Sequence, residues 1–342
     1  MDYSIVSEDR KEVLKKIEAY EQARLFDKDV ENDPPAPELR PDDVDYLGKK
    51  LSSKIKTAVA NRLGRKFFES MIKNGQVLID GVTGEENLAV LKTTGAVITC
   101  NHFGIPDNYI LYHCIRNSLK KKRLYKVIRE GNYTGFSGLF GFLFRNCNTL
   151  PLSSNRRTMI DFMSATDTLL KRGEAVLIYP EQGMWWNYRK PRPFKIGAFK
   201  IAARAGVPVL PAFITMKDDE TRLDEHNYPL QRHTLHIMPP VYPDASLNEK
   251  QAAQKMLEDT FALYKNKYEE TYGIPLSYTT GQENPRGAFE SSVNSSVASS
   301  VASSVVERKA EGKSVRFANT LPVAQNSYSE NATPSAVSPA TV

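Results

Sequence analysis

The stretch AVITCNHFGIPD, residues 96–107, is the most informative part of this chain of 342 residues. Its first five residues form a continuous apolar run, which is typical of a strand buried on both faces of a parallel sheet. A Gly/Pro loop follows, and Pro106 stands where a proline opens a helix, which we expect over residues 107–119. A buried strand that leads through a loop into a helix indicates the α/β class.

The same alternation continues on both sides of this stretch. We expect strands over 76–80, 123–128, 175–179, 207–215 and 234–238, and helices over 85–91, 136–144, 158–171, 194–205 and 248–270. The helix over 136–144 is apolar throughout, so it is expected to be buried or to form a lipid-facing patch. Together these elements predict an α/β fold with a central, mostly buried β-sheet flanked by helices.

Composition divides the chain into three parts. Residues 1–75 are predicted to form a helical N-terminal arm, with a helix over 7–26, a proline-rich break and a basic amphipathic helix over 49–73. Residues 76–275 form the main domain. Residues 276–342 form a low-complexity tail, whose repeats SSVN-SSVA-SSVA-SSVV carry few large apolar side chains, so we expect it to be disordered.

Charge is distributed unevenly over these parts. The chain has 46 Lys and Arg against 40 Asp and Glu, which gives a net charge of +6. Residues 1–45 hold 14 acids and 7 bases (−7) and residues 281–342 hold 5 of each, so residues 46–280 carry +13. Such a basic segment indicates a polyanionic partner, which is a nucleic acid, a membrane surface or a phosphorylated small molecule. Charge alone does not choose among them.

The basic helix over 49–73 allows two interpretations. It contains eight Lys and Arg against the single acid Glu69, and apolar residues recur every four positions from Leu51 to Met71. The simpler interpretation is an amphipathic helix packed on the domain with a solvated basic face. The alternative is a helix that lies on anionic lipid, where each basic residue contributes about 1 kcal/mol to binding.

Several protein classes are excluded by what the sequence lacks. Three cysteines cannot build a secreted disulfide scaffold, and the polar start of the chain is unlike a secretory signal, so a cytoplasmic, reducing environment is expected. No apolar run reaches the roughly 18 residues of a membrane-spanning helix. No nucleotide-binding glycine loop, paired cysteine motif or nucleic-acid recognition motif occurs, so we expect no metal, no nucleotide cofactor and no nucleic-acid partner.

Two patches follow buried strands, where open α/β sheets place their sites. In the first, Asp107 can hydrogen-bond one imidazole nitrogen of His102 and leave the other nitrogen free as a general base. A structural role for this histidine explains the bare spacing equally well. The second patch, residues 179–192, combines Glu181 with two Trp and three cations, which suits a phosphorylated amphiphilic substrate or the lipid headgroup layer, although an ordinary surface loop is the simpler alternative.

Both patches carry motifs of a known family. Asn101-His102 with Asp107 (N-H-x4-D), the Pro180-Glu181 turn and the segment VPVLP at 207–211 resemble the glycerolipid acyltransferases of the lysophosphatidic acid acyltransferase type, in order and in spacing. The resemblance covers residues 76–245. It implies that His102 is the catalytic base and that Asp107 orients it. It further implies that a hydroxyl attacks an acyl thioester directly, without an acyl-enzyme.

The resemblance also implies the rest of the site. The substrate-binding residues would be Asn101, Glu181, Gly183, Arg156 and Arg157. The substrates would be a lysophospholipid and an acyl thioester, either acyl-CoA or acyl-carrier protein, and the enzyme would sit peripherally on the cytoplasmic face of an anionic membrane. No cofactor beyond the thioester co-substrate is implied.

Two departures from the family pattern leave the acceptor open. Gln182 intrudes into the third motif and Gly183-Met184 follow, so the small hydroxyl residue of that motif is absent. Ser154 ends the second motif where an arginine usually holds the acceptor phosphate, although Arg156 and Arg157, which follow at once, or Arg145 upstream could supply the cation. A different lipid acceptor, or a non-catalytic lipid-binding relative, therefore remains as an alternative to a lysophosphatidate acyltransferase.

Overall fold

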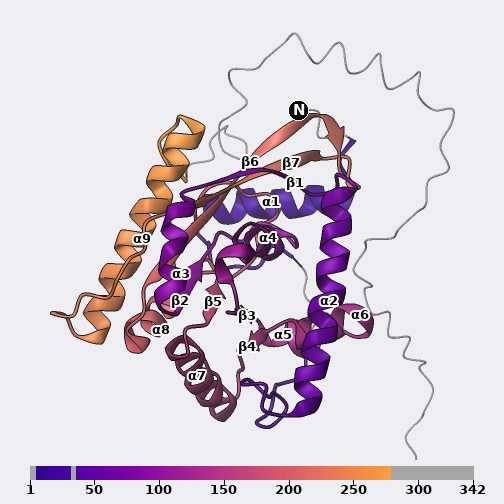
Figure 1. Ribbon diagram of the computed structural model, residues 1–342. Coiled ribbons are helices and arrows are strands. Elements are labelled where there is room, and N and C mark those ends of the chain that lie inside the picture. The colour runs from indigo at the N-terminus through magenta and orange to yellow at the C-terminus, as the bar shows by residue number, and fades with distance from the viewer. Residues whose placement is uncertain (1–4, 32–35, 279–342) are drawn as a thin grey trace, which may run out of the picture. The chain divides into compact units, whose positions relative to one another are not determined.

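The computed structural model describes residues 5–31 and 36–278 (Figure 1). The predicted C-terminal tail, 276–342, lies almost entirely outside the described residues. Within the described residues the main architectural feature is a seven-stranded sheet in the order β1-β7-β6-β2-β5-β3-β4. Neighbouring strands run parallel, except that β6 and β7 are antiparallel. The α/β class predicted from the sequence is confirmed.

The two central strands, β2 (Ala96–Thr99) and β5 (Ala175–Ile178), are buried at every position. Because successive side chains point to opposite faces, Ile98 and Leu177 enter the core on one side of the sheet, and Val97 and Val176 enter the core on the other. A strand covered on both faces must be apolar throughout, which is the pattern seen in the sequence. The remaining strands are β1 (Leu78–Thr83), β3 (Leu124–Ile128), β4 (Thr149–Pro151), β6 (Val209–Leu223) and β7 (Pro229–Ile237).

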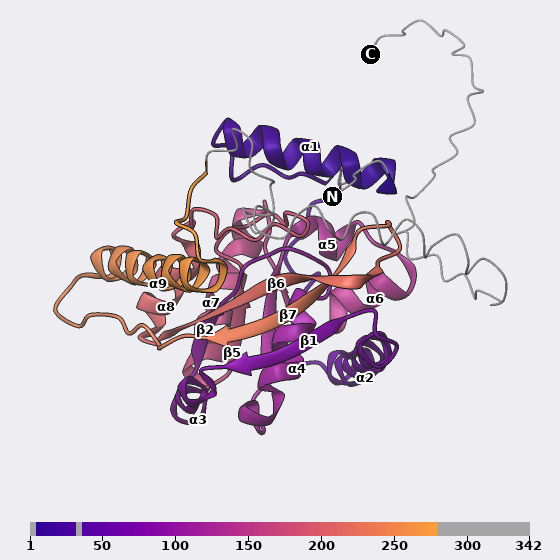
Figure 2. The same ribbon diagram turned by 90° about the horizontal axis from the view of Figure 1, so that it is seen from above.

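Helices cover both faces of the sheet (Figure 2). On one face lie α2 (Leu51–Lys73), α3 (Val90–Thr93), which a short 3-10 turn over Glu85–Ala89 precedes, and α4 (Asp107–Leu119). On the other lie α7 (Arg156–Lys171), α8 (Gly197–Ala205) and α9 (Glu249–Tyr272). Two further helices, α5 (Glu130–Thr134) and α6 (Gly138–Asn146), lie between β3 and β4 in the sequence. The first helix of the chain is α1 (Glu8–Gln22).

The sequence misplaced or missed several elements. β7 begins five residues earlier than expected, and α5 was not expected. β6 continues eight residues past the expected end at 215, because its polar second half is held by pairing with β7 and most of its side chains face solvent. β1 begins two residues later than expected, and β4, with three residues, is too short to show a pattern. The apolar helix α6 is not a buried helix, since Gly141 is its one buried residue and Leu139 is 54% exposed.

The N-terminal segment 8–31 packs onto the domain. Val13 and Ile17 of α1 share a buried cluster with Phe26, Val30 and Trp185. A buried ion pair also joins Glu21 of α1 to Lys190, with 2.7 Å between Oε1 and Nζ. We call residues 8–31 the acidic arm, because an acid of this segment, Glu21, forms an ion pair with a cation of the basic domain.

Candidate active site

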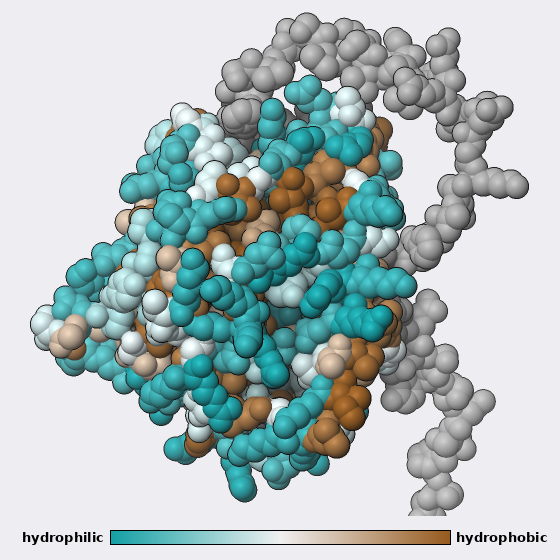
Figure 3. Space-filling view, in the orientation of Figure 1, coloured by the Kyte–Doolittle hydropathy of each residue, from teal (hydrophilic) through white to brown (hydrophobic). Residues whose placement is uncertain are grey.

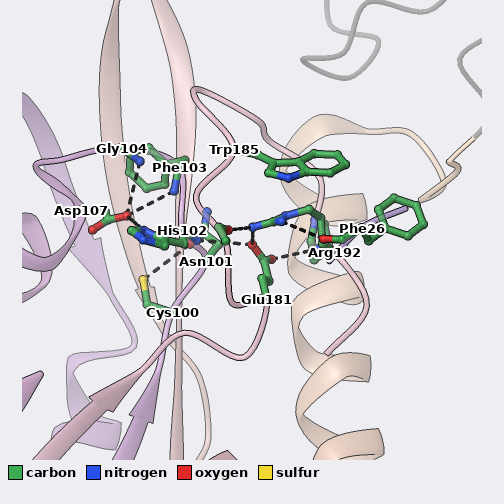
Figure 4. A network of polar contacts seen from close by, with 12 residues as sticks. Phe26, Cys100, Asn101, His102, Phe103, Gly104, Asp107, Glu181, Trp185 and Arg192 are labelled. Atoms are coloured by element: carbon green, nitrogen blue, oxygen red, sulfur yellow. Dashed lines mark hydrogen bonds and ion pairs between the residues drawn. The ribbon is translucent and has the colours of Figure 1, made fainter. Parts of the chain in front are cut away.

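His102 and Asp107 form a hydrogen-bonded pair at the carboxyl end of β2. The Nδ1 atom of His102 lies 2.6 Å from Oδ2 of Asp107, which is the first residue of α4. The same oxygen accepts hydrogen bonds from the backbone N–H groups of Phe103 and Gly104 (Figure 4). Asp107 is fully buried, whereas the His102 side chain is 24% exposed. The loop therefore fixes the carboxylate and leaves the imidazole accessible.

This geometry selects one tautomer of the imidazole. An ionised carboxylate can only accept hydrogen bonds, so the proton lies on Nδ1 and His102 donates it to Asp107. Nε2 is then the unprotonated nitrogen, which can take a proton from a bound hydroxyl. The structure thus brings together the two residues that the N-H-x4-D spacing selected, in the arrangement of an oriented general base.

A third side chain completes this pair, and sequence reasoning missed it. Tyr179, directly after β5, stacks on the His102 ring with 4.0 Å between centroids and 16° between planes. Its hydroxyl donates to Oδ1 of Asp107 over 2.6 Å. Burial, together with the neighbouring carboxylate, holds the pKa of Tyr179 well above its usual range, so the hydroxyl stays a donor. Its position at the end of a buried strand, just before Pro180-Glu181, was the available signal.

Glu181, which was predicted to bind substrate, is buried and forms an ion pair with Arg192. Its Oε2 lies 3.2 Å from Nη2 of Arg192 and accepts from the backbone N–H of His102, while Oε1 accepts from the backbone N–H of Arg192 (Figure 4). Burial raises the pKa of Glu181 and lowers that of Arg192, although each charge opposes the shift of the other. In this structure Glu181 supports the backbone at His102.

Asn101 and Gly183 also have supporting places. The Asn101 side chain donates to the carbonyl of Ile214 (2.9 Å) and accepts from its N–H (2.8 Å), and it thereby joins the loop that carries His102 to β6. At Gly183, an added Cβ would lie 2.7 Å from Oδ1 of Asp29 in the acidic arm. Asn101 and Gly183, which were predicted to bind substrate, therefore lie against other parts of the chain, at β6 and at the acidic arm.

The predicted pair Arg156 and Arg157 is exposed at the start of α7. That helix follows β4, the edge strand, which is three strands away from β2 in the sheet order. The structure does not bring these arginines to His102. A nearer cation is Arg129, which follows β3 and which sequence reasoning missed, because no motif of the chain includes it.

The cations of the loop over residues 185–192 do not face solvent or lipid, contrary to the expectation of a headgroup-binding patch. Lys190 pairs with Glu21, Arg189 with Asp218 and Arg192 with Glu181, and all three cations are buried. Trp185 is also buried, beneath Arg192, whose guanidinium lies 4.7 Å from the ring centroid. An isolated buried charge is costly, so each cation requires its acid. Local sequence did not reveal these partners.

The remaining nucleophiles and histidines near the site are structural. Burial raises the pKa of Cys100 well above its ordinary value, which makes its thiolate inaccessible. His233 stacks on Phe103, and His236 is hydrogen-bonded to Thr83 and Thr215. Over residues 5–31 and 36–278, no group of three or more His, Cys, Asp or Glu side chains is arranged to hold a metal ion.

Residues 81–215 match the family model described as Acyltransferase. These residues form an acyltransferase-family domain. The match spans β2, β5 and the whole candidate site, which confirms the family predicted from the motifs.

A curated relative agrees with this assignment. The chain is 32% identical over 136 residues to a chloroplastic 1-acyl-sn-glycerol-3-phosphate acyltransferase of Brassica napus, and the match covers 38% of the chain. It spans 35%, about a third, of the length of that relative. Among solved structures, the 1-acyl-sn-glycerophosphate (LPA) acyltransferase of Thermotoga maritima aligns with a TM-score of 0.44 and 19% identity, over 68% of this chain and 87% of that one.

Proposed function

We propose that this protein transfers a fatty acyl chain from an acyl thioester to the hydroxyl of a lysophospholipid, with 1-acyl-glycerol-3-phosphate as the acceptor and phosphatidate as the product. The observation that carries the proposal is the His102–Asp107 pair, oriented within an acyltransferase-family domain. Acyl-CoA and acyl-carrier protein present the same thioester, so either can serve as donor. The reaction requires no further cofactor.

The proposed chemistry uses His102 first as a base and then as an acid. Nε2 takes the proton of the acceptor hydroxyl while that oxygen attacks the thioester carbonyl carbon. The resulting tetrahedral intermediate collapses, the carbon–sulfur bond breaks and the departing thiolate receives the proton from Nε2. Asp107 stabilises the transient imidazolium and keeps the ring in position, and its own hydrogen bonds to Tyr179, Phe103 and Gly104 hold it still.

Arg129 is the cation that we propose for the acceptor phosphate. Sheet register aligns Lys126 with Leu177 and Thr99 with Ile178, which puts Arg129 level with Pro180 and Asn101 at the same sheet edge. Two strand spacings of about 4.8 Å separate β3 from β2, so about 10 Å lies between Arg129 and the catalytic loop. A glycerol phosphate and an extended arginine can bridge that span. The Arg129 side chain is 43% exposed, and its Nη1 lies 2.5 Å from Oδ2 of Asp29 in the acidic arm, so an acceptor phosphate would have to share or replace that carboxylate.

The second motif favours a second candidate acceptor. Ser153 and Ser154, which stand where the family has its phosphate-binding arginine, are both bound to the Glu130 carboxylate, at 3.0 and 2.8 Å. At these two positions the chain presents a carboxylate rather than a cation. A lysolipid whose headgroup carries hydroxyls or an amine would find acceptors and a negative charge there, so such a lipid is the alternative substrate.

We propose that α2 holds the enzyme on the membrane. Its apolar residues Leu51, Ile55, Val59 and Leu63 are between 41% and 72% exposed, and with Leu139 of α6 they leave apolar side chains in solvent. Figure 3 shows this apolar surface over the lower part of α2. Lysines flank the stripe, which is the composition of an interfacial helix. Over the described residues, no helix is long and apolar enough to cross a membrane.

Contacts connect this helix to the catalytic loop. Phe68 of α2 stacks on Tyr109 at 4.7 Å between centroids, and the Tyr109 hydroxyl donates to Glu69. Tyr109 lies two residues after Asp107, and the neighbouring Ile105 is 55% exposed. A membrane in contact with α2 would therefore lie close to His102, where a substrate with apolar chains must arrive.

The test is product analysis with a mixed lysolipid pool and both thioester donors. The wild-type protein is expected to release thiol and to acylate lysophosphatidate, whereas His102→Ala should lose activity by at least about 10³-fold at unchanged folding. Retention of activity by His102→Ala would refute the mechanism. Equal acylation of neutral lysolipids would show that the acceptor is the second candidate and not a phosphate-bearing lysolipid. Absence of thiol release would indicate a non-catalytic lipid-binding relative.

A further inference from the structure

The loop over residues 179–195, which we call the Glu181 loop, holds the catalytic histidine on one side. The backbone N–H of Trp185 donates to the His102 carbonyl over 3.1 Å, and that of Asn187 donates to the Phe103 carbonyl over 2.9 Å. Glu181 itself accepts from the His102 N–H. The position of the histidine backbone therefore depends on the position of this loop.

On its other side, the Glu181 loop is held by the acidic arm, which lies outside the acyltransferase-family domain. Glu21 neutralises Lys190, and both side chains are almost completely inaccessible. The Phe26 carbonyl accepts from Nη1 of Arg192 over 3.1 Å (Figure 4). The Lys28 carbonyl accepts from Nε1 of Trp185 over 2.9 Å. Three separate donors of the loop thus have their partners on the arm.

Arg192 joins the two sides directly. One of its terminal nitrogens bonds the arm at Phe26, and the other bonds Glu181 and the Gly183 carbonyl. A continuous chain of polar contacts therefore runs from the arm through Arg192 and Glu181 to the backbone of His102. A buried Lys190 ammonium without Glu21 is costly, so the docked arm stabilises this conformation of the loop.

We infer that the acidic arm is a positioning element of the active site, which fixes the Glu181 loop and through it the catalytic histidine. The inference rests on the proposed use of His102 as the base. Glu21, Phe26 and Lys28 touch no substrate in this scheme. They act through Lys190, Arg192 and Trp185, and the expected consequence of loosening them is a loss of turnover rather than of substrate affinity.

The experiment weakens the arm contact by Glu21→Gln in the full chain. Steady-state kinetics and amide hydrogen exchange of the Glu181 loop are measured on the same preparation. We expect kcat to fall at least about 10-fold with acceptor KM within about threefold, because a small displacement of the base is costly. Exchange at Trp185 and Asn187, whose amides bond the catalytic loop, should accelerate. The double variant Glu21→Gln/Lys190→Gln, a neutral hydrogen-bonded pair, should recover most of kcat and of the protection.

Asp27→Asn is the matched control, because Asp27 is an acid of the same arm whose pair with Lys195 is about half exposed. It should leave kcat and exchange within twofold of wild type. Should Glu21→Gln fail to fold, Trp185→Phe removes the bond to Lys28 with a smaller disturbance and should act in the same direction. Faster exchange with unchanged kcat, or a kcat loss that the double variant does not recover, would overturn the inference. Failure of the proposed function would instead appear as activity in His102→Ala, while the exchange result would stand independently.

Discussion

The hydroxyl of Tyr179 offers the sharpest test of how the proposed catalytic pair, His102 and Asp107, is held in position. Tyr179→Phe keeps the ring that stacks on His102 and deletes only the 2.6 Å hydrogen bond to Oδ1 of Asp107. A hydrogen bond to a charged group contributes about 1.5–3 kcal/mol. Asp107 keeps its bonds to His102, Phe103 and Gly104 through Oδ2, so we expect the lower end of that range.

About 1.5 kcal/mol in the transition state corresponds to a kcat lowered roughly 10-fold, since 1.36 kcal/mol is one factor of ten. Acceptor and donor KM should change by less than about twofold, because Tyr179 does not touch the substrate in the proposed scheme. A far-downfield imidazole N–H proton resonance of His102, the signature of a short bond to a carboxylate, should shift in the variant. Thiol-release kinetics and proton NMR measure both effects.

Tyr46→Phe is the matched control. It deletes one buried hydroxyl, which donates over 2.8 Å to the Pro151 carbonyl at the edge of the sheet. Both variants should lose comparable stability, and only Tyr179→Phe should lose turnover. If both lose kcat equally, or if Tyr179→Phe turns over at the wild-type rate, then Tyr179 has no positioning role.

Three further predictions follow from the site, the surface and the core. Arg129→Gln should raise KM about 10- to 100-fold for a phosphate-bearing acceptor and leave KM for neutral lysolipids unchanged. Arg156→Gln, the control, should change KM for neither acceptor. Equal effects of both substitutions on acceptor kinetics would disprove the assignment of Arg129 to the acceptor phosphate. Ile55→Asp should abolish most binding to anionic vesicles in a flotation assay. Lys54→Ala should weaken this binding about fivefold, which corresponds to about 1 kcal/mol. Vesicle binding that persists in both variants and at high salt would exclude α2 as the membrane contact. Burial lowers the pKa of His233 and of His236 to about 4, below the 6.5 of the unfolded chain, so the unfolded chain binds more protons between these values. The free energy of unfolding should therefore fall as the pH drops from 6.5 towards 4, by about 1.4 kcal/mol per pH unit for each histidine. Urea unfolding at several pH values should show a smaller dependence of this free energy on pH for His236→Gln than for the wild type. Identical pH dependences would contradict the prediction.

Local pattern was enough to predict the centre of the fold and the contact between His102 and Asp107. β2 and β5 are recognisable because a strand covered on both faces must be apolar at every position. His102 and Asp107 are recognisable because one loop and one helix start fix their geometry within six residues.

Long-range contacts escaped the same reasoning. Lys190 and Arg192 suggested a solvent-facing cationic patch, but their partners Glu21 and Phe26 lie more than 160 residues away in the sequence. Nothing local to the Glu181 loop distinguishes a buried ion pair from an exposed cation. The polar half of β6 was not predicted for a related reason. Pairing with β7 holds it as a strand, and it has no apolar periodicity by which the sequence would indicate a strand.

The pairing of β6 with β7 also determines where this chain can be cut. The family match ends at residue 215, within β6, whereas the sheet continues through β7 to β1. A fragment limited to residues 81–215 would lack β7 and half of β1, and the backbone N–H and C=O groups along one side of β6 would lose their partners. Such an open apolar edge invites self-association. The smallest soluble unit of this protein is therefore expected to extend past β7, and expression trials that end at 215 and at 278 should differ in aggregation rather than only in activity.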